Sequence, residues 1–228
     1  MSTPFERYVE FLGTDGRGDR IHQAKELEIV LDKYFKFDSV ESIETGASHS
    51  KEDGCFGVYL LQYIKSKGGV FHSVDNDRNV VVKSERFYNS LGLDIPIAHY
   101  ISDSIKFLKE YRGAPNLIHL DSWNLNLANP VPCMLHGWLE FDAIKDKVPV
   151  GGIVLIDDNY LKGTWVEWLC YQGGKPTGAS ERIDVTYDIV GKGAMIYHWV
   201  KNYATDWELV GDHYNVASHV KVIVRKVK

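Results

Sequence analysis

The chain has 228 residues, of which 44% are hydrophobic and 25% are charged. These values are ordinary for a globular protein, and they exclude intrinsic disorder, collagen and coiled coil as descriptions of the whole chain. The formal net charge of −5 also removes the long-range positive field that a general nucleic-acid binder uses.

The cysteines and the apolar runs indicate the cellular compartment of the protein. Its three cysteines lie far apart and are odd in number, so they form neither a disulfide framework nor a zinc pattern, as is typical of a reducing compartment. The first residues lack the apolar core of a signal peptide, and the longest apolar stretches, such as 58–64, are too short to cross a bilayer. We therefore expect a soluble cytoplasmic protein.

Hydrophobic periodicity predicts alternating strands and helices over most of the chain. Two helices, at 4–12 and 20–36, precede a first strand at 39–45, and the fifth strand is expected at 152–156. The strands between these are expected at 70–74, 97–101 and 116–120, and the intervening helices at 54–66, 78–91, 104–111 and 134–147. Strict alternation predicts a parallel sheet with helices on both faces.

The last third of the chain departs from this alternation. Residues 161–190 fit no strand–helix unit, and we interpret them, with equal weight, as a substrate lid or as an ordinary surface excursion. A helix at 192–203 and a closing antiparallel hairpin of strands at 207–214 and 219–227 follow. We predict a single domain over 1–228, composed of N-terminal helices (1–37), a ligand-binding core (38–160), the 161–190 segment, and a final helix with hairpin (191–228).

Ligands of an open parallel sheet bind beyond the carboxyl ends of its strands, so the residues that follow each strand are candidates. After the first strand, Gly46 permits a tight turn and a close approach of a ligand to the backbone. After the second, Asp75 can accept hydrogen bonds from both hydroxyls of a ribose, or it can cap the following helix. After the third, Ser102 and Asp103 either cap a helix or border an adenine. The candidates after these three strands are Glu44, Gly46, Ala47, Ser48, Asp75, Asn76, Ser102 and Asp103.

Acidic residues follow the fourth and fifth strands. Asp121 follows the fourth, and Asp157, Asp158 and Asn159 follow the fifth, one strand–helix–strand unit later. Neighbouring strand ends would bring Asp121, Asp158 and Asn159 together, and their oxygens suit Mg²⁺, with Ca²⁺ or Mn²⁺ as alternatives. An alternative of equal weight to this metal site is that one aspartate caps a loop and the other is exposed to solvent. Asp157 should face the sheet or support the site from behind, unless the backbone turns there, because successive residues of a strand alternate sides.

Together these residues resemble a known family, the class I S-adenosylmethionine (SAM)-dependent methyltransferases, over roughly 38–160 and more loosely in the tail. The nearest likeness is to the metal-dependent O-methyltransferases, such as catechol O-methyltransferase. Leu120-Asp121-Ser122-Trp123 matches the Leu-Asp-x-Trp pattern of their fourth strand, and Asp158-Asn159 matches the Asp-Asn of their fifth. The resemblance implies a cofactor turn at Glu44-Thr45-Gly46, ribose binding by Asp75, and magnesium on Asp121, Asp158 and Asn159.

The sequence departs from that family at two positions. Asn124 stands where the family has a catalytic lysine after the tryptophan, and Ser48 stands where its cofactor turn has a second glycine. The base is therefore open among Lys162, His136 and His49, each of which has an alternative role as an ordinary surface or loop residue.

The resemblance implies methyl transfer from SAM to a small hydroxylated acceptor, with a divalent ion that activates the acceptor hydroxyl. The cofactor residues are then Glu44, Gly46, Ala47, Ser48, Asp75, Asn76, Ser102, Asp103 and Asp121. We predict Asp121, Asp158 and Lys162 as catalytic residues. Trp123 and Trp165 are expected to wall the acceptor pocket, because aromatic side chains provide large rigid apolar surfaces, and Trp123 is equally a candidate core residue.

Three other functions compete with this one. A metal-independent methyltransferase would use Asp121 and Asp158 to contact the substrate directly. A nicotinamide-dependent oxidoreductase is disfavoured because the three-glycine fingerprint is missing. A binding module would have kept only the fold, consistent with Asn124. We expect no nucleic-acid or membrane partner, and a homodimer on general grounds alone.

Overall fold

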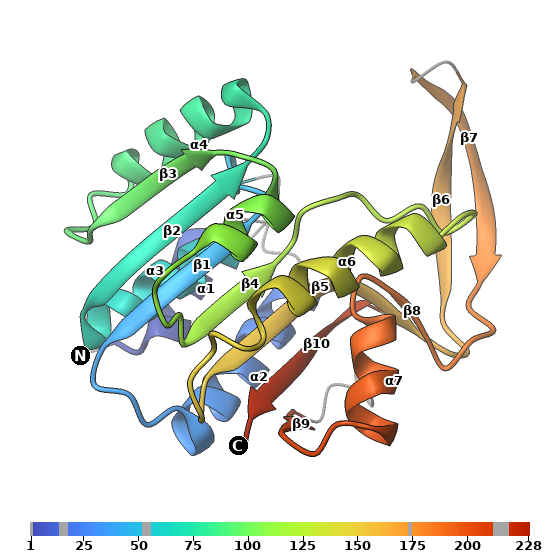
Figure 1. Ribbon diagram of the computed structural model, residues 1–228. Helices are drawn as coiled ribbons and strands as arrows, with labels where there is room; N and C mark the ends of the chain where they lie inside the picture. Colours follow the sequence, from blue (N-terminus) through green and yellow to red (C-terminus); the bar gives the residue numbers. More distant parts are fainter. Residues whose placement is uncertain (1, 14–17, 52–55, 173–174, 212–218) are drawn as a thin grey trace.

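The computed structural model describes residues 2–13, 18–51, 56–172, 175–211 and 219–228, and its central feature is a large sheet covered by helices (Figure 1). The helices are α1 (Pro4–Leu12), α2 (Gly18–Tyr34), α3 (Phe56–Lys67), α4 (Arg78–Ser90), α5 (Ser104–Glu110), α6 (Val131–Ile144) and α7 (Ala194–Asn202). The strands are β1 (Val40–Thr45), β2 (Gly69–Asp75), β3 (Ile97–Ile101), β4 (Leu117–Leu120), β5 (Ile153–Leu161), β6 (Trp165–Gln172), β7 (Lys175–Asp184), β8 (Ile189–Gly191), β9 (Trp207–Leu209) and β10 (His219–Lys226).

The strand order of the central sheet is β3-β2-β1-β4-β5-β10-β9. β1 to β5 are mutually parallel, and β10 runs antiparallel to both of its neighbours, β5 and β9. The predicted α/β fold, a Rossmann-like, doubly wound and mostly parallel seven-stranded sheet with a C-terminal antiparallel hairpin, is therefore confirmed. The short β8, which the sequence did not predict, pairs with β5 outside this order.

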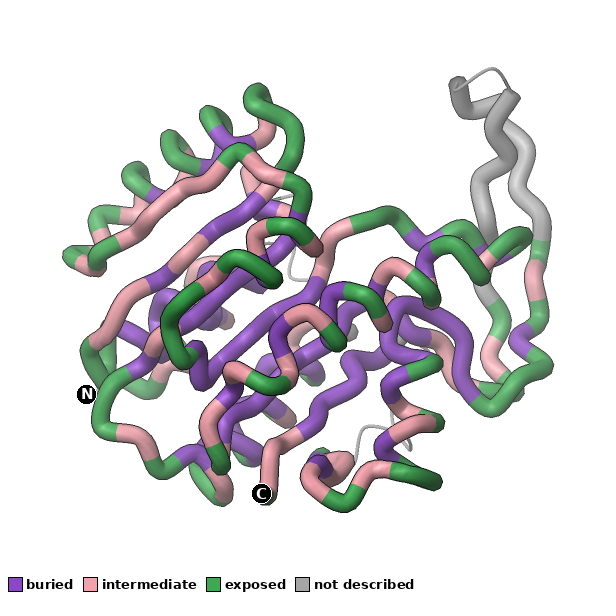
Figure 2. The backbone as a smooth tube through the Cα atoms, viewed as in Figure 1, coloured by how far each residue is buried: buried purple, intermediate pink, exposed green. Residues whose placement is uncertain are grey.

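Alternation along the buried strands explains why helices cover both faces. Ile153 and Leu155 of β5 belong to one hydrophobic cluster, which also includes residues of α1, α2 and α3. Val154 and Ile156 belong to a second cluster, with residues of α5, α6 and α7. Successive side chains of a strand point to opposite faces, so a strand that is apolar at every position needs both covers. Figure 2 shows the buried residues running through the centre of the sheet. Each such apolar side chain contributes roughly 1.5–3 kcal/mol to stability when fully buried.

Most predicted elements are present, with shifted ends. The helix expected at 134–147 begins at Val131, because a proline is tolerated in the first turn, where Pro132 lies, and it ends at Ile144. β5 continues to Leu161, beyond the expected end at 156, because its last residues pair with β10 and β8. The strand expected at 207–214 ends at Leu209, and residues 212–214 of that prediction lie outside the described residues.

Residues 161–190, which fit no strand–helix unit in the sequence, contain strands that the sequence analysis did not predict. β6 and β7 form an antiparallel hairpin, a two-stranded sheet of its own, and β8 follows it. Figure 1 shows this hairpin projecting beside the central sheet. Among the described residues, β6 and β7 pair with each other, and no helix lies between them. The segment therefore lacks the strand–helix alternation from which the other strands were predicted. Its role as a lid stays a prediction.

No helix among the described residues is long and apolar enough to cross a membrane.

Candidate functional site

A cavity of about 660 Å³ lies at the carboxyl ends of β1 to β5. That size suits a cofactor or small-molecule site. Eight of the nine predicted cofactor residues line it: Gly46, Ala47, Ser48, Asp75, Asn76, Ser102, Asp103 and Asp121. Its wall also includes Arg20 of α2, which sequence reasoning missed because nothing in a helix far from the strand ends marks it as a cavity residue.

Gly46 is where the turn after β1 meets the end of β4. Its φ of 77° lies in the left-handed region, which glycine adopts without steric cost. A Cβ at this position would lie 2.5 Å from the backbone oxygen of Asp121. Both the backbone conformation and the close approach therefore require glycine here.

Asp75 connects the turn after β1 to the end of β2. Its Oδ2 accepts a hydrogen bond from the Ala47 N–H at 3.2 Å, and its Oδ1 accepts one from the Asp77 N–H at 2.8 Å. The cap of α4 is Asp77, which accepts from the Asn79 N–H, so the alternative reading of Asp75 as a helix cap is wrong. The carboxylate of Asp75 is held in place at the cavity wall. Asp103, by contrast, does cap α5, and it also lines the cavity.

Glu44, the ninth predicted cofactor residue, lies behind the turn and not on the cavity wall. Its carboxylate is fully buried, and it accepts hydrogen bonds from Tyr88 Oη at 2.7 Å and from Ser48 Oγ at 3.0 Å. Glu44 thus anchors the turn to α4.

A buried ionic cluster extends beneath the cavity. His119 Nε2 lies 3.5 Å from Asp157 Oδ2, and His119 Nδ1 lies 3.8 Å from Glu44 Oε1. Lys221 pairs with the Asp157 carboxylate, and its Nζ lies 3.2 Å from His119 Nε2. Burial and the charge of Lys221 lower the pKa of His119, but the nearby carboxylates of Asp157 and Glu44 outweigh them and leave this pKa above its ordinary value.

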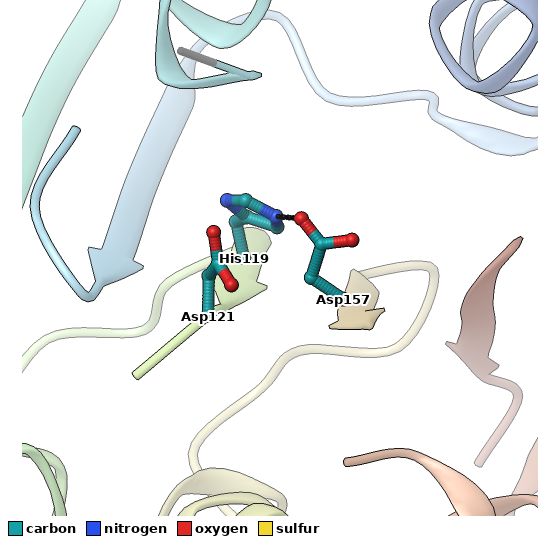
Figure 3. Close-up of side chains that lie close together, drawn as sticks. All are labelled: His119, Asp121 and Asp157. Atoms are coloured by element: carbon teal, nitrogen blue, oxygen red, sulfur yellow. Dashed lines mark ion pairs between the residues drawn. The ribbon is translucent and has the colours of Figure 1, made fainter. Parts of the chain in front are cut away.

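His119, Asp121 and Asp157 present ligand-type atoms within 4.8 Å of one another (Figure 3). The ammonium of Lys221 already supplies a positive charge to the Asp157 carboxylate. A second cation at the same carboxylate would be repelled by it.

Asp157 and Asp158 both line the cavity, although neighbouring residues of a strand normally face opposite sides. The backbone turns at Asp158, whose φ is 51°, an uncommon value for a residue other than glycine. This turn is the stated exception to the expectation that Asp157 faces the sheet. The Asp157 carboxylate lies at the cavity wall and also pairs with His119 and Lys221 beneath it.

A lysine that the sequence analysis did not select lies between the two carboxylates predicted to bind a metal. Lys192 Nζ is 2.5 Å from Asp121 Oδ1 and 2.9 Å from Asp158 Oδ2. Burial opposes the charge of Lys192, but the two carboxylates outweigh it, so its pKa lies above the ordinary value. Burial also raises the pKa of Asp121, to about 6, against the opposing effect of Lys192.

Asn159, the third predicted metal ligand, does not face the cavity. Its side chain is buried; its Nδ2 donates to the backbone oxygens of Ile156 and Asp157, and its Oδ1 accepts from the Gly193 N–H at 2.7 Å. The amide oxygen is thus used to hold the start of α7. With a lysine between the carboxylates and the amide turned away, the predicted magnesium set does not fit a divalent ion.

The three candidate bases lie in different places. His49 and His136 line the cavity. Lys162 does not; its side chain is 66% exposed and lies 3.9 Å from Asp188. Of the two tryptophans expected at the acceptor pocket, Trp123 lines the cavity and stacks on His136, with ring centroids 5.1 Å apart. Trp165 is exposed and packs against Arg182, outside the cavity lining.

A hydrogen-bond chain orients the His136 ring. The Ser122 hydroxyl donates to Glu140 Oε1 at 2.6 Å and lies 2.7 Å from His136 Nε2. The Ser104 hydroxyl lies 3.3 Å from the same His136 nitrogen and 3.2 Å from the Ser122 oxygen. The two serines and Glu140 therefore hold the Nε2 edge of the ring.

No protein-family model matches the sequence, and no curated protein does. Solved structures share the fold. An S-adenosylmethionine-dependent methyltransferase from Clostridium acetobutylicum matches with a TM-score of 0.54 and 12% identity, covering 97% of this chain and 98% of that chain. A candidate rRNA methylase from Clostridium thermocellum matches with a TM-score of 0.53 and 12% identity, covering 90% and 96%. NSun6 from Pyrococcus horikoshii with SFG matches with a TM-score of 0.58 and 13% identity, covering 90% and 52%.

The protein therefore has the class I SAM-dependent methyltransferase fold. At these identities the likeness establishes the fold, and the activity has to be argued from the cavity. The closer likeness to metal-dependent O-methyltransferases is not supported, because the ligand set of those enzymes is not assembled here.

Proposed function

We propose that the protein is a SAM-dependent methyltransferase. The observation that carries this proposal is the convergence of the Gly46 turn, the Asp75 carboxylate and Asp121 on one cavity at the carboxyl edge of the sheet. That edge is where open parallel sheets bind nucleotides. Asp75 is placed to accept the ribose hydroxyls, and the backbone near Gly46 is placed to approach the ligand closely.

The charge of the cavity favours a cationic ligand. Five aspartates line it: Asp75, Asp103, Asp121, Asp157 and Asp158. Among the described lining residues, Arg20 is the one arginine or lysine. Even with Lys192 and Lys221 beneath the wall, negative groups exceed positive ones, which attracts a positively charged sulfonium. When bound, SAM supplies an already activated methyl group.

The residues of the chain would then position the acceptor and remove its proton. Trp123 offers a flat apolar wall beside His136. We propose His136 as the base, because its ring lines the cavity and the Ser122 hydroxyl holds it at Nε2. Holding the acceptor in line with the methyl group can contribute up to roughly 7–11 kcal/mol in ideal cases.

For the acceptor we propose a small hydroxylated molecule, and thus O-methylation. The carboxylate-rich cavity and the net charge of −5 would repel the phosphates of a nucleic acid. RNA is the second candidate, favoured by the structural neighbour named as an rRNA methylase.

Ligand-dependent thermal unfolding tests the cofactor. S-adenosylhomocysteine (SAH) at about 100 times its dissociation constant should stabilise the protein by roughly 2.7 kcal/mol, and NAD⁺ should not. Asp75→Asn should remove most of this shift, whereas Asp146→Asn, at a carboxylate that is 83% exposed, should keep it. A shift with NAD⁺ but none with SAH would replace the proposal with an oxidoreductase.

Transfer of a radiolabelled methyl group tests the acceptor. A panel of phenols and sugars should accept label, whereas total RNA should not. Labelling of RNA alone would establish the second candidate.

A further inference from the structure

The ammonium of Lys192 has an oxygen acceptor for each of its three protons. These are Asp121 Oδ1 at 2.5 Å, Asp158 Oδ2 at 2.9 Å and the Asp121 backbone oxygen at 3.0 Å. The lysine side chain is 2% exposed, so water contributes little to its solvation. A buried ammonium with three acceptors is held in one position as a fixed point charge.

The surrounding backbone is shaped to bring this lysine to the site. Lys192 lies between β8 and α7, and glycines permit a close approach on both sides. A Cβ at Gly191, whose φ is 136°, would lie 2.0 Å from the Asp158 backbone oxygen, and a Cβ at Gly137 of α6 would lie 2.3 Å from the Lys192 backbone oxygen. The lysine is therefore built into the wall and does not reach the carboxylates as a surface side chain.

We propose that Lys192 is the resident cation of this site, in the position where a divalent ion would otherwise bridge Asp121 and Asp158. The methyl transfer proposed above then requires no metal. This part of the inference rests on that proposed function. The geometry carries the proposal, because the same carboxylates cannot surround an ammonium and a divalent ion at once. The third predicted ligand, Asn159, is already bonded to the backbone.

The role of Lys192 is to position other groups and not to transfer a proton. All three of its protons are bonded to oxygens of its own chain, so none is directed to a substrate. It reduces the repulsion between Asp121 and Asp158 and holds both at the cavity wall.

This arrangement predicts a gain of metal binding when the ammonium is removed. Lys192→Met keeps most of the apolar stem but leaves three oxygens around a vacated position, which is a donor set for a hard cation. Titration with Mn²⁺, followed by electron paramagnetic resonance, should show one site in Lys192→Met with an affinity at least tenfold above that of the wild type. The matched control is Lys162→Met, at an exposed lysine, which should bind no more Mn²⁺ than the wild type.

The double variant Lys192→Met/Asp158→Asn should lose the new site, which would assign it to these oxygens. A folded Lys192→Met protein that binds Mn²⁺ no better than the wild type would overturn the proposal. So would a stoichiometric Mn²⁺ site in the wild type that Asp158→Asn removes. If Lys192→Met does not fold, the wild-type titration decides between the two outcomes.

SAH binding, measured on the same samples, separates this inference from the proposed function. If the wild type fails to bind SAH, the function is wrong while the Mn²⁺ result still stands. If SAH binds and transfer is unchanged after treatment with EDTA, both proposals are supported. If EDTA abolishes transfer and Mn²⁺ restores it, Lys192 is not the resident cation.

Discussion

At the scale of single residues, the site depends on a position that only glycine can occupy without strain. Gly46 has both a left-handed backbone and a neighbouring chain within contact distance of its missing Cβ. Gly92 also has a left-handed backbone, with a φ of 61°, but nothing within 4 Å of its missing Cβ. The two glycines therefore separate the cost of backbone strain from the cost of a collision.

Gly46→Ala should destabilise the protein by about 1–3 kcal/mol and weaken SAH binding at least tenfold, because the turn must move away from Asp121. Gly92→Ala should cost only about 1 kcal/mol, the strain of the left-handed conformation, and leave SAH binding unchanged. Urea unfolding and calorimetric SAH titration measure both effects. Equal losses in the two variants would show that contact with Asp121 is unimportant.

His136→Ala should reduce the rate constant of methyl transfer by roughly 100- to 10,000-fold, the usual contribution of a general base. The SAH affinity should stay within about twofold, because the proposed role concerns the acceptor and not the cofactor. His198→Ala, at an exposed histidine of α7, is the control and should retain full activity. Normal turnover in His136→Ala would show that His136 is not the base and would leave His49 as the candidate at the cavity.

At the scale of elements, the part of the chain farthest from expectation is the β6–β7 hairpin. Among the described strands, it pairs with none of the central sheet, whose carboxyl edge carries Gly46, Asp75 and Asp121. A role as a lid would concern the acceptor.

Replacement of residues 166–183 by a short glycine-containing turn tests this role. We expect SAH affinity to change less than about twofold and the kcat/KM for the acceptor to fall about tenfold, because lids act by enclosing the substrate. Calorimetry and a transfer assay provide the two readings. Unchanged kcat/KM would make the hairpin a surface excursion, and a loss of SAH binding would place it in the cofactor site.

At the scale of the whole molecule, charged groups lie in the centre of an otherwise apolar sheet. Glu44, His119, Asp157 and Lys221 are all buried and pair with one another across neighbouring strands. Such groups are stable only while their charges match, because an unpaired buried charge is costly. The stability of the fold should therefore depend on the protonation of His119.

The pKa of His119 is raised in the folded protein. A histidine of this kind contributes stability that is fully present below its unfolded pKa and is lost as pH rises through the folded value. The difference in unfolding free energy between the wild type and His119→Gln should therefore be larger at about pH 5.5 than at about pH 9. Urea unfolding at both values measures it. A difference that grows with pH would mean that the buried histidine is neutral.

The sequence by itself determined the alternation of β1 to β5 with the helices between them, and the turns that line the cavity. Alternation of apolar residues and the position of Gly46, Asp75 and Asp121 directly after strands are local signals, and parallel strands bring such ends to one edge. It also placed Asp158 at the site but directed Asp157 toward the sheet, and only the backbone turn at Asp158 shows how both reach the cavity.

Only the tertiary structure decided what occupies the position between the carboxylates. Lys192 lies in a short loop between β8 and α7, although the sequence predicts a helix from residue 192, and it reaches Asp121 across 71 positions of the chain. The direction of the Asn159 amide likewise depends on Gly193 in that loop. Contacts between distant segments leave no periodic signal in the sequence, because they follow from how the packed elements meet.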